Sequence, residues 1–402
     1  MRRTLTTTAA LLCAAVLTLA GCAEPPGAGG DTSAQPSASG SASGGGEAFK
    51  ACMVSDSGGF DDKSFNQTSY KGLTDAKTEL GIETGEVEST TNADFAKNIQ
   101  SMVDADCNII VTVGFLLSDD TLAAAKKNPD VKFAIVDNND PKSYPAATNL
   151  KPLVFNTAQS SFLGGYLAAG MSQTKKVGTF GGLKIPTVTI FMDGFSQGVE
   201  YYNQQKGENV QVLGWDADKQ DGQFVPGDNP FENVKGGQQT AQGLVSQGAD
   251  VVFPVAGPAG EGALQAAKAS GGKVNAIWVD TDGCVSAEAY CPNIISSVYK
   301  GLDVAVKDAI TATKDGSFSN KPYVGTLENE GTGLSPFHDF DGKVPAELKT
   351  ELDTLKADIA RLLPVPKALV RALAREADRP AQRLLGDAHQ RLLRRARALN
   401  VG

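Results

Sequence analysis

Short apolar segments alternate along the chain with amphipathic segments of helical length, and this alternation constrains the fold more than any other feature. The apolar segments are rich in Val, Ile and Phe, as strands buried on both faces of a parallel sheet are. We predict strands at 51–55, 108–113, 132–136, 150–155, 176–180, 187–192, 210–213, 250–254, 275–279 and 294–297. We predict helices at 65–79, 94–105, 116–128, 160–171, 194–206, 236–247, 260–270 and 301–315.

This order of elements predicts a doubly wound α/β architecture, with helices on both faces of mostly parallel sheets. Some ten strands are many for one such sheet, so two similar halves divided near residues 155–160 fit the pattern better. The length of 402 residues is sufficient for two domains.

The first residues have the pattern of a secretory signal. Arg2 and Arg3 precede a mostly apolar run at 11–19, which is too short to span a bilayer as a mature helix. Residues 19–22 read Leu-Ala-Gly-Cys, which is similar to a bacterial lipobox and implies cleavage before Cys22 and acylation of its thiol. An ordinary signal peptide with an incidental cysteine is the alternative.

We therefore expect a lipoprotein signal peptide at 1–21 and a flexible tether rich in Gly, Ser and Pro at 22–47. No later segment is apolar for 18 residues, so the anchor is expected to be lipid rather than protein. The mature protein is then exported and held at the outer face of the cell membrane.

The C-terminal segment differs in composition from the rest of the chain. Arginine is absent between Thr4 and Ala360, whereas residues 361–402 hold nine Arg and one Lys against three acids. One interpretation is a basic amphipathic helix that binds anionic lipid, and the other is an unselected tail after a change of reading frame near Ala360. The abrupt change favours the second, so we expect 361–402 to lie outside the fold.

Four cysteines remain once Cys13 leaves with the signal peptide and Cys22 takes lipid. They are Cys52, Cys107, Cys284 and Cys291. An even number in an exported chain predicts two disulfides, and three pairings are possible. The chain has no CxxC pair to support a zinc site, and we expect neither a metal nor a cofactor.

Polar residues follow the carboxyl ends of several predicted strands, which is where open α/β sheets bind ligands. They are Asp56, Asp137, Asp193, Gly257, Asp280 and Lys300. Each one alone is explained by a helix cap, a turn or a surface charge, but several at equivalent strand ends predict a binding site. We assign Asp193 to capping the helix predicted from Gly194.

The segment Asp-Asp-Lys-Ser-Phe-Asn-Gln at 61–67 resembles the signature of the basic membrane lipoprotein family, which includes purine nucleoside receptors of ABC importers. Further matches lie at 136–137, 159–169, 257–258, 279–282, 296–300 and 325–329, so the resemblance covers about residues 49–355. It implies a type I periplasmic-binding-protein fold, in which three crossovers join two lobes around a ligand cleft.

The implied lobe 1 comprises residues 48–157 and 301–322, and the implied lobe 2 comprises 158–300 and 323–355. Members of the family usually end in a short strand or an extended tail. In this chain that region lies near the Arg-rich segment, which leaves the last element of lobe 2 in question.

The resemblance implies that the cleft holds a purine nucleoside, and the residue types suit the base. Aromatic rings above and below hold a flat base, and we assign this role to Phe65 and Phe195. Asn66 offers a donor and an acceptor to the base edge, while Asp137 and Asp56 offer acceptors to ring N–H groups.

The same resemblance assigns the ribose to charged residues. Asp280 can accept hydrogen bonds from two ribose hydroxyls, and Lys300 can donate to another. Gly257 is a further candidate for the site. The formal net charge of −9 argues against a nucleic-acid partner, because phosphate binding needs a basic surface.

We thus expect a monomeric binding protein that delivers its ligand to an ABC permease. The chain has no P-loop, so ATP hydrolysis would belong to a separate ATPase subunit. A lipid-anchored surface sensor or adhesin, or a protein that binds a sugar or another small ligand, is the alternative.

An α/β hydrolase is the rival from a different functional class. Residues 194–198 read Gly-Phe-Ser-Gln-Gly, which matches a nucleophile elbow between a predicted strand and a predicted helix, with Ser196 as nucleophile. A triad would add Asp280 or Asp303, and then His338. No HGGG-type oxyanion segment precedes the serine, so we expect a protein that is not an enzyme.

Overall fold

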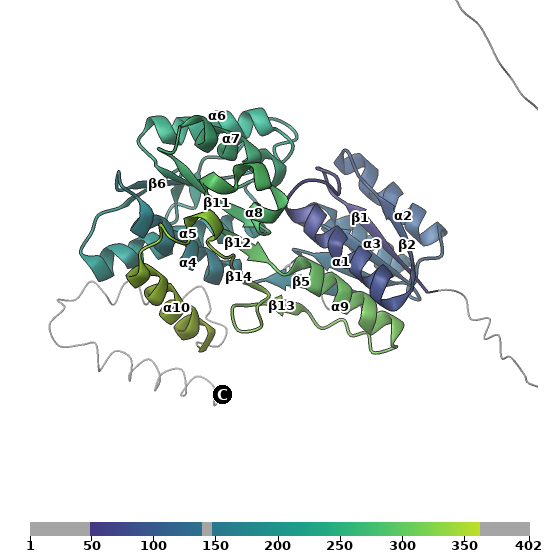
Figure 1. Ribbon diagram of the computed structural model, residues 1–402. Helices are drawn as coiled ribbons and strands as arrows, with labels where there is room; N and C mark the ends of the chain where they lie inside the picture. Colours follow the sequence, from purple (N-terminus) through teal and green to yellow (C-terminus); the bar gives the residue numbers. More distant parts are fainter. Residues whose placement is uncertain (1–48, 139–146, 362–402) are drawn as a thin grey trace, which may run out of the picture. The chain divides into compact units, whose positions relative to one another are not determined.

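The computed structural model describes residues 49–138 and 147–361 (Figure 1). The predicted signal peptide, the tether with Cys22, and the Arg-rich segment beyond Arg361 lie outside these residues. The described residues form two six-stranded sheets and one two-stranded hairpin. We call the part built around the first sheet lobe 1 and the part built around the second sheet lobe 2.

Lobe 1 contains a sheet that is parallel throughout, with strand order β13-β5-β4-β3-β1-β2. Its strands are β1 (Lys50–Ser55), β2 (Glu83–Val87), β3 (Ile109–Val113), β4 (Lys132–Val136), β5 (Leu150–Phe155) and β13 (Tyr323–Gly325). Its helices are α1 (Phe65–Leu80), α2 (Phe95–Asp104), α3 (Ser118–Lys127) and α9 (Leu302–Lys314).

Alternate residues of β1 enter different cores, as the two-residue period of a strand requires. Ala51 and Met53 pack with residues of α1 and α9, whereas Cys52 and Val54 pack with residues of α2 and α3. Helices therefore cover both faces of this sheet, and its central strands are buried on both sides, as the continuous apolar runs predicted.

Lobe 2 contains a sheet with strand order β14-β12-β11-β10-β6-β7, in which only β14 runs antiparallel to its neighbour. Its strands are β6 (Lys176–Gly181), β7 (Gln211–Leu213), β10 (Val251–Val255), β11 (Asn275–Asp280), β12 (Ile294–Lys300) and β14 (Thr332–Leu334). Its helices are α4 (Thr157–Met171), α5 (Pro186–Lys206), α6 (Val234–Ser246), α7 (Glu261–Ala269), α8 (Gly283–Ser286) and α10 (Ala346–Arg361). The hairpin pairs β8 (Trp215–Asp216) with β9 (Asp221–Gly222).

The chain passes between the two sheets three times. The passages follow β5, β12 and β13. We had expected the last passage at residues 322–323, which would place β13 in lobe 2. Instead, Tyr323 pairs with Leu153 of β5 in lobe 1, so the last passage begins after Gly325.

The apolar run at 187–192, predicted as a strand, lies instead in the first turns of helix α5. Pro186 occupies the first turn of that helix, after Ile185 in an extended conformation, which is a favoured way to begin a helix. Glycines bring α5 against α4: a Cβ on Gly198 would lie 2.0 Å from the carbonyl oxygen of Phe162. The β-branched residues of this run therefore belong to a buried helix.

The earlier start of α5 also makes the predicted role of Asp193 as a helix cap wrong. Asp193 lies within α5, and its Oδ1 accepts hydrogen bonds from Trp215 Nε1 at 3.0 Å and Gln220 Nε2 at 2.6 Å. Asp193 thus holds the β8–β9 hairpin against α5. It does not cap a helix, and it is not among the residues that line the pocket described below.

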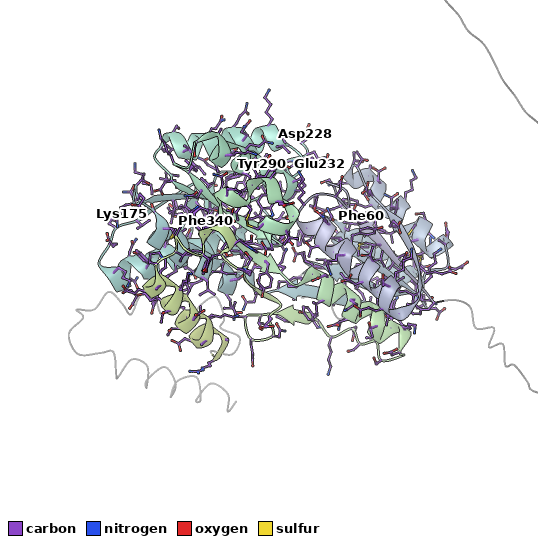
Figure 2. The ribbon with its side chains drawn as sticks, in the orientation of Figure 1. Phe60, Lys175, Asp228, Glu232, Tyr290 and Phe340 are labelled. Atoms are coloured by element: carbon purple, nitrogen blue, oxygen red, sulfur yellow. A yellow bond between two sulfur atoms is a disulfide. The ribbon has the colours of Figure 1, made fainter. Side chains whose placement is uncertain are left out.

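Helix α10 is the terminal element that the sequence left in question. Its Leu348 and Leu352 are buried in the core of lobe 2, which also holds Phe340, labelled in Figure 2. Tyr166 of α4 donates a hydrogen bond from its hydroxyl to Glu351 Oε2 at 2.9 Å. No helix within residues 49–138 and 147–361 is long and apolar enough to cross a membrane.

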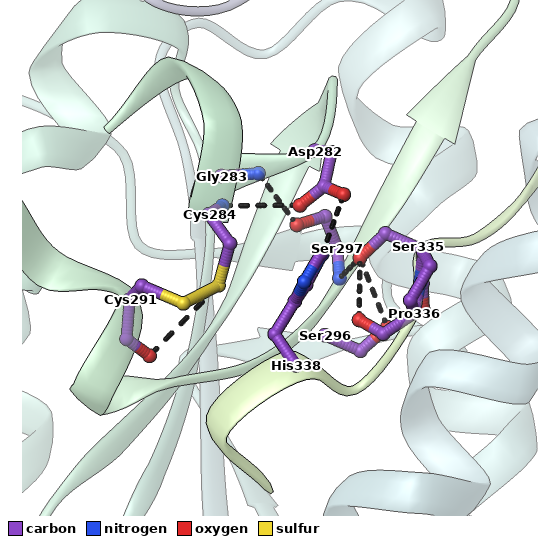
Figure 3. Close-up of a disulfide and its surroundings, with 9 residues drawn as sticks. All are labelled: Asp282, Gly283, Cys284, Cys291, Ser296, Ser297, Ser335, Pro336 and His338. Atoms are coloured by element: carbon purple, nitrogen blue, oxygen red, sulfur yellow. Dashed lines mark hydrogen bonds and ion pairs between the residues drawn. A yellow bond between two sulfur atoms is a disulfide. The ribbon is translucent and has the colours of Figure 1, made fainter. Parts of the chain in front are cut away.

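The four remaining cysteines form two disulfides. Cys52 of β1 pairs with Cys107, which precedes β3, the neighbour of β1 in the sheet. Cys284 pairs with Cys291 across a short loop of lobe 2 (Figure 3). The first bridge ties together two strands that begin at the same sheet edge, and the second closes a surface loop.

Candidate functional site

A pocket of about 570 Å³, part of it open to solvent, is lined by residues of both lobes. The structure brings seven of the eight predicted ligand-binding residues to this pocket: Asp56, Phe65, Asn66, Asp137, Gly257, Asp280 and Lys300. Most of them stand at or just after strand ends, in agreement with the general rule for open α/β sheets.

A buried ion cluster occupies one part of the pocket. Lys300, the last residue of β12, is only 4% exposed, and its Nζ lies 2.7 Å from Asp137 Oδ2 and 3.1 Å from Asp280 Oδ1. Both aspartates lie at strand ends and have left-handed backbones, with φ of 64° and 67°. Non-glycine residues in this conformation often mark functional sites.

The cluster perturbs the pKa of two of its members. Burial raises the pKa of Asp137 above its usual value, although the Lys300 ammonium opposes the shift. Burial alone would lower the pKa of Lys300, but the two carboxylates outweigh it and the pKa is raised. Lys300 is therefore a firmly charged cation that is shared by two acids.

Asp56 and Asn66 form a second polar group in the pocket. Asn66 Nδ2 donates to Asp56 Oδ1 at 3.0 Å, and Asn66 Oδ1 is buried without a hydrogen-bond partner among the described residues. Burial raises the pKa of Asp56 to about 8, so its carboxyl is mostly protonated at neutral pH. A Cβ on Gly114 would lie 2.1 Å from Asp56 Oδ2, so this close approach requires glycine.

The loop before α1 fixes the orientation of Phe65 and Asn66. The carboxylate of Asp62 accepts hydrogen bonds from the backbone N–H groups of Ser64 at 2.9 Å, Asn66 at 2.9 Å and Gln67 at 3.0 Å. These are donors that a helix start otherwise leaves unsatisfied. Burial raises the pKa of Asp62 to about 6.

The same loop contacts lobe 2 directly. Ser64 Oγ donates to Asp280 Oδ2 at 3.0 Å, and Trp278 Nε1 donates to the carbonyl oxygen of Lys63 at 3.3 Å. Lys63 Nζ also lies 3.0 Å from Glu261 Oε2, and Glu261 Oε1 accepts from the hydroxyl of Tyr290, labelled in Figure 2. The two lobes thus meet through the loop that carries Phe65.

Phe195 does not reach the pocket, so its prediction as a ligand-stacking ring was wrong. It is fully buried in the core of lobe 2, with its ring centroid 5.3 Å from that of Phe253. Phe191, one helical turn earlier, lines the pocket instead. The difference follows from the earlier start of α5, which moves the pocket-facing turn toward its N-terminus.

Phe231 is a second pocket ring that the sequence did not indicate. It lies in the loop between β9 and α6, where no strand end or recognised motif marks it. A Cβ on Gly182 would lie 2.4 Å from this ring, so Gly182 leaves the space that the ring occupies. Only the folded position of the loop shows that Phe231 faces the pocket.

The structure does not assemble the hydrolase triad. Ser196 lies inside helix α5, not at a turn from a strand to a helix, so the elbow pattern was a chance match. His338 Nε2 lies instead 2.7 Å from Asp282 Oδ2, a contact drawn in Figure 3. Cys284 lies beside this pair, but its sulfur is bonded to Cys291.

Residues 49–226 and 227–344 match the family described as ABC transporter substrate-binding protein PnrA-like. The chain belongs to this family. The match spans both lobes and confirms the resemblance that the segment at 61–67 suggested.

Similar PnrA-like proteins include Basic membrane protein A of Borreliella burgdorferi, which is 32% identical over 80% of this chain and 89% of its own length. The ABC transporter nucleoside-binding protein BmpA of Lactococcus lactis is 29% identical over 77% of this chain and 87% of its own length. A solute-binding protein of an ABC transporter system from Aeropyrum pernix superposes with a TM-score of 0.69, covering 82% of this chain and 97% of that one at 23% identity. These comparisons confirm the predicted type I periplasmic-binding-protein fold for this PnrA-like chain.

Proposed function

We propose that this PnrA-like protein captures purine nucleosides in the pocket between its lobes and passes them to the permease of an ABC importer. The observation that carries the proposal is the composition of the pocket. Aromatic rings from both lobes line it, together with an amide, a mostly protonated carboxyl and a buried ion cluster. A flat heterocycle joined to a polyol matches this combination.

The base is proposed to lie between Phe65 of lobe 1 and Phe231 of lobe 2. Phe231 lines this pocket beside Gly182 and Gly257. The Phe65 and Phe191 rings lie 4.4 Å and 5.3 Å from Lys300 Nζ, so both border the ion cluster. Stacking on each ring is worth about 1–3 kcal/mol.

The base edge is proposed to meet Asn66 and Asp56. The buried Oδ1 of Asn66 accepts from a ring N–H or an exocyclic amine. The protonated carboxyl of Asp56 donates to a ring nitrogen or carbonyl, and its ionised form accepts instead. This pair thus suits purines that present a donor beside an acceptor.

The ribose is proposed to meet the ion cluster. Asp280 already accepts from Ser64 and lies beside Lys300, but a carboxylate has about four acceptor positions, so it can also accept from the 2′ and 3′ hydroxyls. Lys300 donates to a sugar oxygen with its remaining proton. Because Ser64 and Asp280 belong to different lobes, a bound sugar strengthens the contact that holds the lobes together.

Delivery to a permease is inferred from the family, which is one of ABC transporter substrate-binding proteins. We propose that the protein works as a lipid-anchored monomer, held by acylated Cys22, with ATP hydrolysed by a partner subunit. No chemical conversion of the ligand is proposed, because the pocket residues bind polar groups and the serine of the elbow motif lies inside a helix.

Isothermal titration of the mature protein tests this proposal. Adenosine, guanosine and inosine should bind with dissociation constants in the micromolar range or below, which corresponds to about −8 kcal/mol or better. Ribose and galactose serve as controls and should give no binding heat. Binding of a sugar without binding of any nucleoside would show that the ligand is a sugar and would contradict the proposal.

A further inference from the structure

A side chamber opens from the pocket behind Phe191. It measures about 260 Å³, part of it open to solvent, and shares Asp137, Thr187 and Phe191 with the main pocket. Its other walls come from the end of β5, the start of α4 and the first turns of α5. These added residues are Val154, Phe155, Thr157 and Ile190.

The chamber contains a buried polar group that lacks a partner. The hydroxyl of Thr157 has no hydrogen bond among the described residues, and Thr157 is only 2% exposed. A buried hydroxyl without a partner is costly, so its presence in a ligand-facing cavity indicates that something polar completes it. Asp137 and Thr187 are the other polar residues that line the chamber.

The other four lining residues are apolar, and none of the described residues lining the chamber is basic. Lys300, whose Nζ lies 5.3 Å from the Phe191 ring and 5.8 Å from the Phe155 ring, is shared by Asp137 and Asp280. A phosphate entering here would meet the Asp137 carboxylate without a counter-charge of its own. The chamber therefore suits a small neutral group that carries a hydroxyl or a short apolar substituent.

We propose that the side chamber receives the 5′ end of a bound nucleoside, with Thr157 hydrogen-bonded to the 5′ hydroxyl. This inference rests on the function proposed above. In that arrangement Asp56 and Asn66 hold the base edge, and Asp280 holds the 2′ and 3′ hydroxyls. The 5′ hydroxymethyl group is the remaining polar substituent, and the chamber beside Asp137 is the space left for it.

The consequence is a selection at the 5′ position. Neutral substituents are accepted because the chamber has room and apolar walls. A 5′-phosphate is rejected because the chamber offers a carboxylate instead of a free cation. The site thereby distinguishes nucleosides from nucleotides through Asp137 and Thr157 rather than through the base.

Titration of adenosine, 5′-deoxyadenosine and adenosine 5′-monophosphate against the wild type and Thr157→Val tests the inference. Thr157→Val keeps the shape of the side chain and removes its hydroxyl. We expect it to weaken adenosine about twofold to tenfold and to leave 5′-deoxyadenosine unchanged. The monophosphate should bind the wild type at least about tenfold more weakly than adenosine, as expected for a charge buried without a partner.

Ser161→Ala is the matched control. Ser161 also lies on α4, with a buried hydroxyl that lacks a partner among the described residues, but it does not line the chamber. Its substitution should leave the affinities for adenosine, 5′-deoxyadenosine and the monophosphate unchanged. Val154→Phe fills the chamber from another wall and should weaken 5′-methylthioadenosine more than 5′-deoxyadenosine.

The outcomes separate this inference from the proposed function. Equal weakening of adenosine and 5′-deoxyadenosine by Thr157→Val, or wild-type binding of the monophosphate as tight as that of adenosine, overturns the chamber assignment alone. Failure of the wild type to bind any purine nucleoside overturns both.

Discussion

Lys300 and Asp137 form a buried ion pair across the two lobes, with 2.7 Å between Nζ and Oδ2. Lys300 is the last residue of β12 in lobe 2, and Asp137 follows β4 in lobe 1. The pair places the charges of the pocket at the point where the lobes meet, so its effects on stability and on ligand binding are linked.

Lys300→Met should reduce the free energy of unfolding by about 3–5 kcal/mol, because it leaves two carboxylates buried without their cation. Urea denaturation followed by circular dichroism measures the effect. The control is Lys71→Met, which removes an exposed pair with Asp75 and should cost less than about 1 kcal/mol. Equal stabilities of Lys300→Met and the wild type would show that the carboxylates do not need the ammonium.

Asp56 should make the ligand-free protein less stable as pH rises. Its pKa in the folded protein is about 8, above the usual value near 3.8, so the folded state holds a proton that the unfolded state loses. The contribution of Asp56 to stability should therefore be greatest below about pH 4, fall between pH 4 and 8 by at most about 1.4 kcal/mol per pH unit, and level off above 8.

Asp56→Asn should flatten that part of the profile, since the amide does not titrate. Unfolding free energies at pH 5 and pH 7.5 for both proteins provide the comparison. Asp62 contributes in the same direction up to about pH 6, so the variant should retain part of the slope. A profile with the same slope in Asp56→Asn would mean that other groups carry it.

The aromatic rings should separate into binding and core residues. Phe65→Ala and Phe231→Ala should each weaken all purine nucleosides together by about 1–3 kcal/mol, because every purine uses the stacking face alike. Phe195→Ala should instead reduce the free energy of unfolding by about 3–5 kcal/mol, as loss of a core phenylalanine does. Titration and denaturation of the three variants decide between the roles, and a stable Phe195→Ala protein that cannot bind would restore Phe195 to the site.

Closure of the lobes should be visible in tryptophan fluorescence. Trp278 Nε1 donates across the lobes to the carbonyl oxygen of Lys63, whereas Trp215 donates to Asp193 within lobe 2. Saturating guanosine should change the emission of the wild type and of Trp215→Phe, because closure changes the surroundings of Trp278. A ligand-induced change that survives in Trp278→Phe would assign the signal to another process.

Membrane attachment should depend on Cys22, which lies outside the described residues. In cells, Cys22→Ser should release the protein from the membrane fraction, because one acylated cysteine supplies the proposed anchor. Retention of the variant after washing with carbonate would point to another anchor, and the Arg-rich segment 361–402 would be the first to delete.

The sequence predicted the order of strands and helices along the chain well where their patterns are local. Continuous apolar runs identified the buried strands, and Asp137, Asp280 and Lys300 followed from their places at strand ends. Strand β2 was not predicted, because it lies at a sheet edge and reads Glu-Thr-Gly-Glu-Val, with little apolar surface. The first turns of helix α5 were mistaken for a strand because they are rich in β-branched residues, whose strand propensity is overridden by tertiary packing.

The parts of the site that depend on loops were beyond the sequence pattern. Phe231 reaches the pocket only because the chain between β9 and α6 folds back over Gly182. Thr157 is an ordinary first residue of a helix until the start of α5 is placed beside it. Both positions result from contacts between segments that are distant in the sequence, and the local periodicity of apolar residues does not indicate such contacts.

Titration of guanosine and of the free base guanine against the wild type and Asp280→Asn tests the central claim most directly. If the nucleoside lies in this pocket with its ribose on Asp280, the variant should weaken guanosine by about 1–3 kcal/mol, because it removes a charged acceptor. The weak affinity for guanine should stay nearly unchanged, and circular dichroism should show that the variant is folded. Equal losses for guanosine and guanine, or no loss for either, would contradict the proposed orientation of the ligand.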